Sequence, residues 1–177
     1  MAKLSIHIIG LGVSENAQLD AQAQSALGDA RWVIASPRQL DVVKRLLVDQ
    51  QTKELPPLRE LLQWLNSLAA GSESESSKHT SIAILASGDP LFYGIGAWFG
   101  RNFASEQLHF YPAVSSIQAA CHELGLSLQD VDVLSLHGRP LEKIRSHLKR
   151  KQTLVILTDK NSVPQALAKE CVNAGFG

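Results

Sequence analysis

Short apolar runs alternate with amphipathic stretches along the first half of the chain. The runs at 4–12, 31–36 and 81–87 have the length and the β-branched composition of buried strands, and two glycines close the first of them. Residues 17–28 are rich in Ala, Leu and Gln, which favours a helix, and residues 56–70 place apolar side chains every three or four positions. We therefore expect strands and helices to alternate from the start of the chain.

The same alternation continues in the second half. Further strands are predicted at 108–113, 131–138 and 153–159. Helices are predicted after Pro37, from the glycine-rich stretch near 90 to about Phe103, over 114–125, after Pro140 and after Pro164. Strands that alternate with helices throughout a chain predict an α/β protein with a mostly parallel sheet.

Composition narrows the classes of function. Lys and Arg together number 17, as do Asp and Glu, so a net charge of zero favours neither nucleic acid nor an anionic membrane surface as a partner. The apolar runs are far shorter than the ~20 residues of a membrane helix. The N-terminus leads directly into a strand, which leaves no room for a signal peptide, and the two cysteines form no metal-ligand spacing. We expect a cytoplasmic protein without a metal site.

One stretch, ILASGDPLFYGIG at 84–96, has more glycines than a strand-to-helix connection requires. Gly94 and Gly96 fall where a helix should begin, and each glycine in a helix lowers its stability by about 1 kcal/mol relative to Ala. Two explanations are open. Either the backbone packs closely on another element, or a ligand approaches it.

The first loop does not have the signature of a dinucleotide site. In a GxGxxG motif that began at Gly10, the third glycine would fall at Glu15, and an acid there would face the pyrophosphate. Strand 31–36 ends without the Asp or Glu that holds a ribose hydroxyl, and no GK[ST] sequence follows any strand. Neither a Rossmann site, nor a P-loop, nor the usual methyltransferase signature is therefore predicted.

Three strand ends carry unusual residues. The sequence SGDP closes one strand, YPAVSS follows another, and SLHGRP closes a third. Ligands of open α/β sheets bind beyond the carboxyl ends of the strands, so these loops are candidates for a site. Each also has a simpler explanation: a capped helix for the first, an N-cap at Ser115 or Ser116 for the second, and a solvated turn for His137 and Arg139.

Taken together, these motifs resemble the tetrapyrrole (corrin and porphyrin) methylases, which depend on S-adenosylmethionine. The matching segments occur in the family's order. They are IIGLG (8–12), IASPRQL (34–40), LASGDPLFYGIG (85–96), YPAVSSIQAACHELGL (111–126), DVLSLHGRPL (132–141) and LVILTDKNSVPQALA (154–168). The SLHGRP sequence, and the GDP sequence followed by Phe-Tyr and GIG, look like the precorrin-7 or cobalt-precorrin-7 C5-methyltransferase branch.

The resemblance implies a fold and a domain division. It implies two α/β lobes, each a mostly parallel sheet flanked by helices, with the cofactor in the cleft between them and a homodimer as the usual assembly. We expect the first lobe, with the GDP loop, at 1–111 and the second at 112–177. The family usually continues beyond the last helix seen here. We therefore expect a truncated second lobe, in a fragment or in the N-terminal part of a fusion with a C15-methylating, decarboxylating partner.

The resemblance also implies a set of site residues. S-adenosylmethionine, which leaves as S-adenosylhomocysteine, would contact Gly12, Ser87, Gly88, Asp89, Pro90, Tyr93, Gly94, Ser115, Ser116, Leu136 and His137. A neutral protein must gather positive charge locally to hold a polycarboxylate, so Arg38 and Arg139 are the candidates for binding the substrate. The reduced macrocycle is itself electron-rich, so no residue is expected to serve as an indispensable general base.

The function implied is methylation of C5 of precorrin-7, or of its cobalt form, in cobalamin biosynthesis. Two alternatives stay open at this point: a methylase that acts on another carbon of a precorrin or porphyrinoid, and a non-catalytic module that binds the cofactor without transferring its methyl group.

Overall fold

The computed structural model describes residues 4–70 and 80–176, in two compact units that divide between Ser115 and Ser116. The division lies a few residues beyond the boundary at 111/112 that the sequence suggested. The polar sequence GSESESSKHT at 71–80 predicts a loop; residues 71–79 lie outside the described residues, and a strand begins at Thr80.

The first unit is built on a five-stranded parallel sheet. Its strands are β1 (Leu4–Gly10), β2 (Trp32–Ala35), β3 (Gln51–Glu54), β4 (Thr80–Ala86) and β5 (Leu108–Tyr111). They lie in the order β3-β2-β4-β1-β5, with every pairing parallel. The two longest strands, β1 and β4, pair in the middle of the sheet and are buried on both faces, which explains their continuous apolar sequences. The α/β class expected from the sequence is confirmed.

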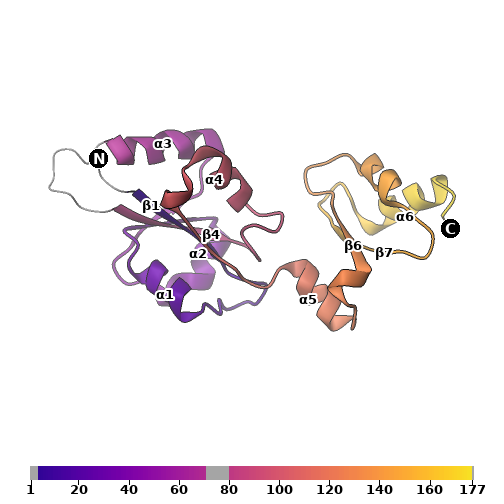
Figure 1. Cartoon of the computed structure of the whole chain (residues 1–177), viewed down its shortest axis with the longest axis horizontal. Helices are drawn as coiled ribbons and strands as arrows, with labels where there is room; N and C mark the ends of the chain where they lie inside the picture. Colours follow the sequence, from indigo (N-terminus) through magenta and orange to yellow (C-terminus); the bar gives the residue numbers. More distant parts are fainter. Residues whose placement is uncertain (1–3, 71–79, 177) are drawn as a thin grey trace. The chain divides into compact units, whose positions relative to one another are not determined.

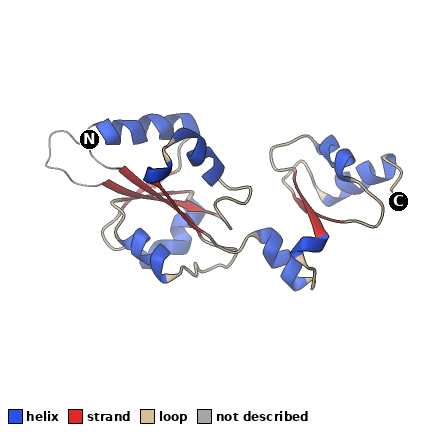
Figure 2. Cartoon of the chain, in the orientation of Figure 1, coloured by secondary structure: helices blue, strands red, loops and turns tan. Residues whose placement is uncertain are grey.

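Helices cover both faces of this sheet (Figures 1 and 2). They are α1 (Ala21–Gly28), α2 (Pro37–Val43), α3 (Leu58–Ala70) and α4 (Gly96–Asn102). Figure 1 shows α3 and α4 above the sheet and α1 and α2 below it. Alternate residues of the strands feed two separate cores: Ile6 and Ile8 pack with α3 and α4, whereas Ile9 packs with α1 and α2.

The second unit has a smaller sheet. Strands β6 (Val131–Ser135) and β7 (Thr153–Leu157) pair in parallel, with Val131 opposite Thr153, between α5 (Ser116–Glu123) and α6 (Pro164–Asn173). Leu134, Leu136, Ile144 and Leu167 form its core. The helix predicted after Pro140 is a 3₁₀ helix instead, η5 (Leu141–His147), so that prediction of an α-helix is wrong. One buried side chain, Ile144, anchors this short element to the core.

Three other local predictions differ from the structure. Strand β3 was missed because its sequence, QTKE, is polar and mostly exposed at the sheet edge. Helix α1 begins at Ala21 rather than at 17, because the Asp20 carboxylate accepts the N–H of Ala23 at 2.7 Å and caps the helix there. Helix α4 begins at Gly96, so the residues before it belong to a loop and not to a first turn. The remaining 3₁₀ turns are η1 (Lys44–Leu46), η3 (Ser105–Gln107) and η4 (Leu128–Asp130).

Candidate functional site

The loops that leave β1 and β4 are joined beyond the carboxyl end of the sheet. The N–H of Leu11 donates to the carbonyl of Ala86 at 2.9 Å, and the N–H of Gly88 donates to the carbonyl of Gly12 at 3.0 Å. Gly12 and Gly88 form an isolated antiparallel bridge, and both have positive φ angles, of 71° and 65°. Side chains are strained in that conformation, so glycine suits both positions. The structure thus brings Gly12 and Gly88, both predicted as site residues, into contact.

Gly10 packs closely against neighbouring segments at the carboxyl end of the sheet, and it was not among the residues predicted for the site. A Cβ atom added to Gly10 would lie 2.6 Å from the carbonyl oxygen of Gly88 and 2.8 Å from the Cβ of Ala113. The end of β1 therefore meets the segments that follow β4 and β5 at this one residue. A signal was present in the sequence: Gly10 is the last residue of a buried strand, where close approach of another backbone is a common reason for glycine.

Asp89 organises the loop that it belongs to. Its Oδ1 atom accepts the N–H of Leu91 at 2.8 Å and the N–H of Phe92 at 3.0 Å. This is the local side-chain-to-backbone bonding by which an Asp closes a turn. Of the two roles considered for this carboxylate, capping and attraction of a cation, the structure supplies direct contacts for capping.

Close packing within the loop explains the two glycines of the GIG sequence. A Cβ on Gly94 would lie 2.5 Å from the carbonyl oxygen of Pro90, and one on Gly96 would lie 2.6 Å from the same oxygen. That oxygen also accepts the N–H of Gly96 at 2.8 Å. Directly before Gly94 lies Tyr93, whose φ of 57° is uncommon for a residue other than glycine. The loop thus packs closely around the carbonyl of Pro90, and the two glycines allow this packing.

A hydrogen bond connects this loop to the start of α2. The Nε2 of Gln39 donates to the Oγ of Ser87 at 3.1 Å, while Gln39 also completes a capping box with Ser36. Arg38, predicted to bind the substrate, lies in the first turn of α2 and is exposed. The structure therefore places Arg38 beside the residue that contacts Ser87.

The remaining predicted residues lie at the unit boundary or in the second unit. Ser115 is buried, whereas Ser116 is exposed as the first residue of α5. Leu136 is fully buried in the core of the second unit, where its N–H donates to the carbonyl of Leu157 and its carbonyl accepts the N–H of Arg139. His137 and Arg139 are exposed. The Nη1 of Arg139 donates to the carbonyl of Ser135 at 3.3 Å, a long bond that folds the side chain toward β6.

Asp159 is a second residue that the sequence analysis missed. Its Oδ2 accepts the N–H of Gly138 at 2.8 Å, and its Oδ1 accepts the N–H groups of Asn161 and Ser162 at 2.9 and 3.0 Å. These bonds stabilise the ionised form and hold the pKa of the carboxyl well below its usual value. The signal was the sequence DKNS directly after a strand, which is typical of an Asx turn.

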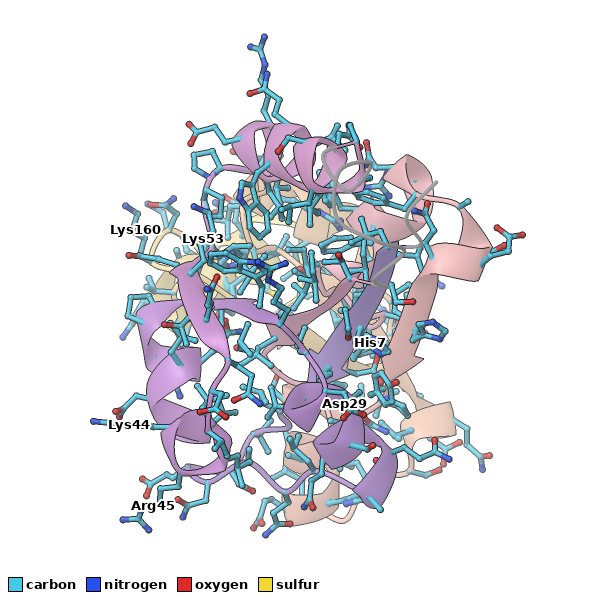
Figure 3. All side chains as sticks on the ribbon, turned by 90° about the vertical axis from the view of Figure 1, so that its left-hand side faces the viewer. His7, Asp29, Lys44, Arg45, Lys53 and Lys160 are labelled. Carbon is cyan, nitrogen blue, oxygen red and sulfur yellow. The ribbon has the colours of Figure 1, made fainter. Side chains whose placement is uncertain are left out.

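A separate hollow lies on the α1 face of the first unit and contains none of the predicted site residues. It encloses about 610 Å³ and is lined by residues that include His7, Asp29 and Tyr111. Figure 3 shows His7 on its strand and Asp29 at the end of α1. A hydrogen bond of 2.9 Å joins Nδ1 of His7 to the Tyr111 hydroxyl, and burial raises the pKa of that phenol, with Asp20 adding to the effect.

The described residues, 4–70 and 80–176, have neither a cluster that could bind a metal ion nor a helix that could span a membrane. No group of three or more His, Cys, Asp and Glu side chains is arranged there to hold a metal ion. None of the helices in those residues combines the length and the apolar character of a membrane span.

Comparison with known proteins places these features in a family. The family model described as Tetrapyrrole (Corrin/Porphyrin) Methylases matches residues 5–172. The chain is 33% identical over 170 residues to the precorrin-6Y C(5,15)-methyltransferase [decarboxylating] of a Sinorhizobium species, a match that covers 96% of this chain and 39% of that protein. It is 38% identical over 98 residues to the cobalt-precorrin-7 C(5)-methyltransferase of Salmonella typhimurium, covering 54% of this chain and 47% of that protein.

The fold is also known from solved structures. The uroporphyrin-III C-methyl transferase of Thermus thermophilus, in complex with S-adenyl homocysteine, superposes with a TM-score of 0.64 at 20% identity, over 97% of this chain and 77% of that one. The family resemblance expected from the motifs is confirmed, and the curated relatives have the names of the expected branch. The matched region spans less than half the length of these two relatives.

Proposed function

We propose that this chain, which belongs to the tetrapyrrole (corrin/porphyrin) methylases, transfers a methyl group from S-adenosylmethionine to C5 of precorrin-7 or cobalt-precorrin-7. The observation that carries the proposal is the identity of 38% to a cobalt-precorrin-7 C(5)-methyltransferase. The decarboxylating C(5,15) relative supports it, because the chain matches that longer protein along 96% of its own length. The reaction belongs to cobalamin biosynthesis.

The loops beyond β1 and β4 fit the cofactor. A Cβ added to Gly12 would approach one atom, the carbonyl oxygen of Val114, and only to 3.9 Å, so the backbone there lies open to a ligand. Ser87 offers an exposed hydroxyl beside it. An open glycine backbone and a hydroxyl suit a ligand with ribose hydroxyls and an amino-acid end. Asp89, Pro90, Tyr93 and Gly94 shape the loop that would hold it, and Ser115, Ser116, Leu136 and His137 are proposed to complete the contacts.

Orientation is the main contribution that we assign to the protein. The cofactor supplies an electrophilic methyl group on a sulfonium, and the electron-rich macrocycle supplies the carbon nucleophile. Holding two reactants in line can lower a barrier by about 7–11 kcal/mol in favourable cases. The tightly packed loop around Pro90 is suited to this task, because Asp89 and the glycines fix its backbone. No residue is proposed as a general base.

Arg38 and Arg139 are proposed to bind the carboxylates of the substrate. Both are exposed, and a guanidinium can grip a carboxylate with two parallel hydrogen bonds. Arg139 would exchange its 3.3 Å bond to the Ser135 carbonyl for a carboxylate, which a guanidinium binds more strongly because the acceptor is also charged and two parallel bonds can form. A homodimer and a partnership with a C15-methylating decarboxylase stay predictions of the family resemblance, and a cytoplasmic location stays a prediction from the cysteines and the N-terminal sequence.

The test combines titration calorimetry with product analysis. The purified chain is titrated with S-adenosylmethionine and S-adenosylhomocysteine, and is then incubated with cofactor and precorrin-7, in cobalt-free and cobalt forms, for mass analysis. The proposal expects binding of both cofactor forms and the gain of one methyl group by the substrate. Binding without transfer would favour a non-catalytic cofactor module. Transfer to a different precorrin or porphyrinoid would favour a methylase that acts on another carbon.

A further inference from the structure

A tight turn follows β6 at the edge where we place the cofactor. The N–H of Arg139 donates to the carbonyl of Leu136 at 3.0 Å, which closes a four-residue β-turn over 136–139. The first central residue, His137, has a negative φ, and the second, Gly138, has a φ of +67°. A positive φ at the second central position alone is the mark of a type II turn, and it explains the glycine.

Types I and II differ in the orientation of the central peptide, which in this turn joins His137 to Gly138. A turn in an exposed loop can exchange one orientation for the other by rotation of that single peptide. The structure shows what opposes the exchange: the N–H of this peptide donates to the Oδ2 of Asp159 at 2.8 Å. The N–H and C=O of a trans peptide point in opposite directions, so the carbonyl of His137 is directed away from the Asp159 carboxylate.

Asp159 is itself held firmly. Its Oδ1 accepts from the backbone of Asn161 and Ser162 and from the Ser162 hydroxyl at 3.0 Å, and its own N–H donates to that hydroxyl at 2.8 Å. Ser162 is almost completely buried. The contact also continues the pairing of the two strands, since the N–H of Leu136 donates to the carbonyl of Leu157 just before it. The Asp159 carboxylate, which follows the neighbouring strand β7, is therefore a rigid acceptor for the N–H of the turn.

We propose that Asp159 is a positioning residue for the cofactor site: it holds the turn 136–139 in the type II form and so presents the carbonyl oxygen of His137 as a fixed acceptor. The matching ligand group is an N–H or O–H donor of the cofactor, such as its ribose hydroxyls or amino groups. This inference rests on the proposed function. It goes beyond it by assigning a task to a residue that is distant in sequence from every predicted contact.

The two carboxylate oxygens of Asp159 have different partners, so a substitution can break one set of contacts and keep the other. In Asp159→Asn, the amide oxygen can still accept from Asn161 and Ser162, but the NH₂ group then faces the N–H of Gly138, and two donors cannot bond. The substitution therefore breaks the contact to the turn and spares the loop 159–162. Ser162→Ala is the matched control, because it removes two bonds of the same network and leaves the Oδ2 contact to Gly138 in place.

Two measurements are made on the whole chain. Amide hydrogen exchange is followed at Gly138, and affinity for S-adenosylhomocysteine is measured by calorimetry. We expect a protected Gly138 amide in the parent and in Ser162→Ala, and fast exchange in Asp159→Asn. Loss of a charge-assisted bond predicts about ten-fold weaker cofactor binding by Asp159→Asn, whereas Ser162→Ala should stay within about two-fold of the parent while melting at a lower temperature.

Several results would overturn the inference. A Gly138 amide that exchanges freely in the parent would show that Asp159 does not hold the turn, and this measurement needs no variant to fold. Equal affinities for Asp159→Asn and the parent, or equal losses in Asp159→Asn and Ser162→Ala, would remove the positioning role. If the parent itself binds no S-adenosylhomocysteine, the proposed function fails, and the role toward the cofactor fails with it. The exchange result would still decide whether Asp159 holds the turn.

Discussion

Two loops of this protein reach their shape in opposite ways. The loop 87–95 is held by itself: Asp89 bonds to the backbone two and three residues later, and Gly94 and Gly96 crowd the carbonyl of Pro90. The turn 136–139 is held from a distance, because Asp159 reaches it from the end of the next strand. The first loop is shaped mainly by its own sequence, although Gly12 and Gln39 also bond to it. The second can be loosened by a change 21 residues away.

This difference decides what a sequence motif can reveal. In the first loop most of the residues that shape it fall inside one short motif, so the motif carries most of the explanation. In the second the motif SLHGRP contains the glycine of the turn but not the carboxylate that fixes it. A motif match in such a loop identifies the exposed residues but not the distant residue, here Asp159, that holds them in place.

The largest effect is expected from Gly94→Ala in the self-held loop. The new methyl carbon would lie 2.5 Å from one backbone oxygen and 2.8 Å from another, so the loop must rearrange. Overpacking of this kind costs about 1–3 kcal/mol of stability, and we expect binding of S-adenosylhomocysteine to fall below detection in calorimetry. Gly100→Ala in α4 is the control, since nothing lies within 4 Å of its added carbon. That change should raise helix stability by about 1 kcal/mol and leave binding unchanged.

Unchanged cofactor affinity in Gly94→Ala, despite a lower melting temperature, would show that the packed loop around Pro90 is not part of the cofactor site.

A smaller effect is expected from Arg139→Ala at the turn that is held from a distance. Loss of a charged hydrogen bond to a carboxylate should raise the KM for the tetrapyrrole about ten-fold, with cofactor affinity unchanged. The effect should shrink at high salt, which screens the parent's interaction. Arg145→Ala is the control: Arg145 is already paired with Glu170 at 2.7 Å, so its removal should not change KM. Loss of cofactor binding in Arg139→Ala, with KM preserved, would reverse our assignment of the two ligands.

Asp89 allows the capping role to be separated from the charge. Asp89→Ala removes the acceptor of two backbone N–H groups and should cost about 1 kcal/mol of stability, with weaker cofactor binding as the loop loosens. Asp89→Asn keeps an acceptor oxygen in place and should behave like the parent in both measurements. If the Asn variant binds S-adenosylhomocysteine as weakly as the Ala variant, the charge reaches the cofactor and the capping explanation is insufficient.

The pH dependence of stability gives the smallest signal. The pKa of Asp159 is lowered in the folded protein, so its contribution is fully present above the usual carboxyl pKa of about 4 and is lost as the pH falls toward the depressed value. The difference in melting temperature between the parent and Asp159→Asn should be constant at neutral pH and should narrow in strong acid. A difference that does not change with pH would show that ionisation of Asp159 contributes nothing to stability.

Local patterns accounted for much of the fold and of the first loop. The family resemblance of the motifs suggested Gly12, Ser87 and Gly88 as candidate site residues. The buried strands β1 and β4 and the amphipathic helix α3 were predictable, because apolar runs and periodic apolar positions express them directly. The polar edge strand β3 and the 3₁₀ helix η5 were not, because one depends on its pairing with β2 and the other on packing of Ile144. Gly10 and Asp159 were missed for the same reason: their importance lies in partners that are distant in sequence.

The central claim is that this chain places a methyl group on C5 of a precorrin. The most direct measurement supplies S-adenosylmethionine with a ¹³C-labelled methyl group, together with precorrin-7 or cobalt-precorrin-7, and locates the label in the product by NMR. We expect one labelled methyl group, bonded to C5, and S-adenosylhomocysteine in equal amount. A label at another carbon, or no label in the tetrapyrrole while the chain binds both ligands, would contradict the claim.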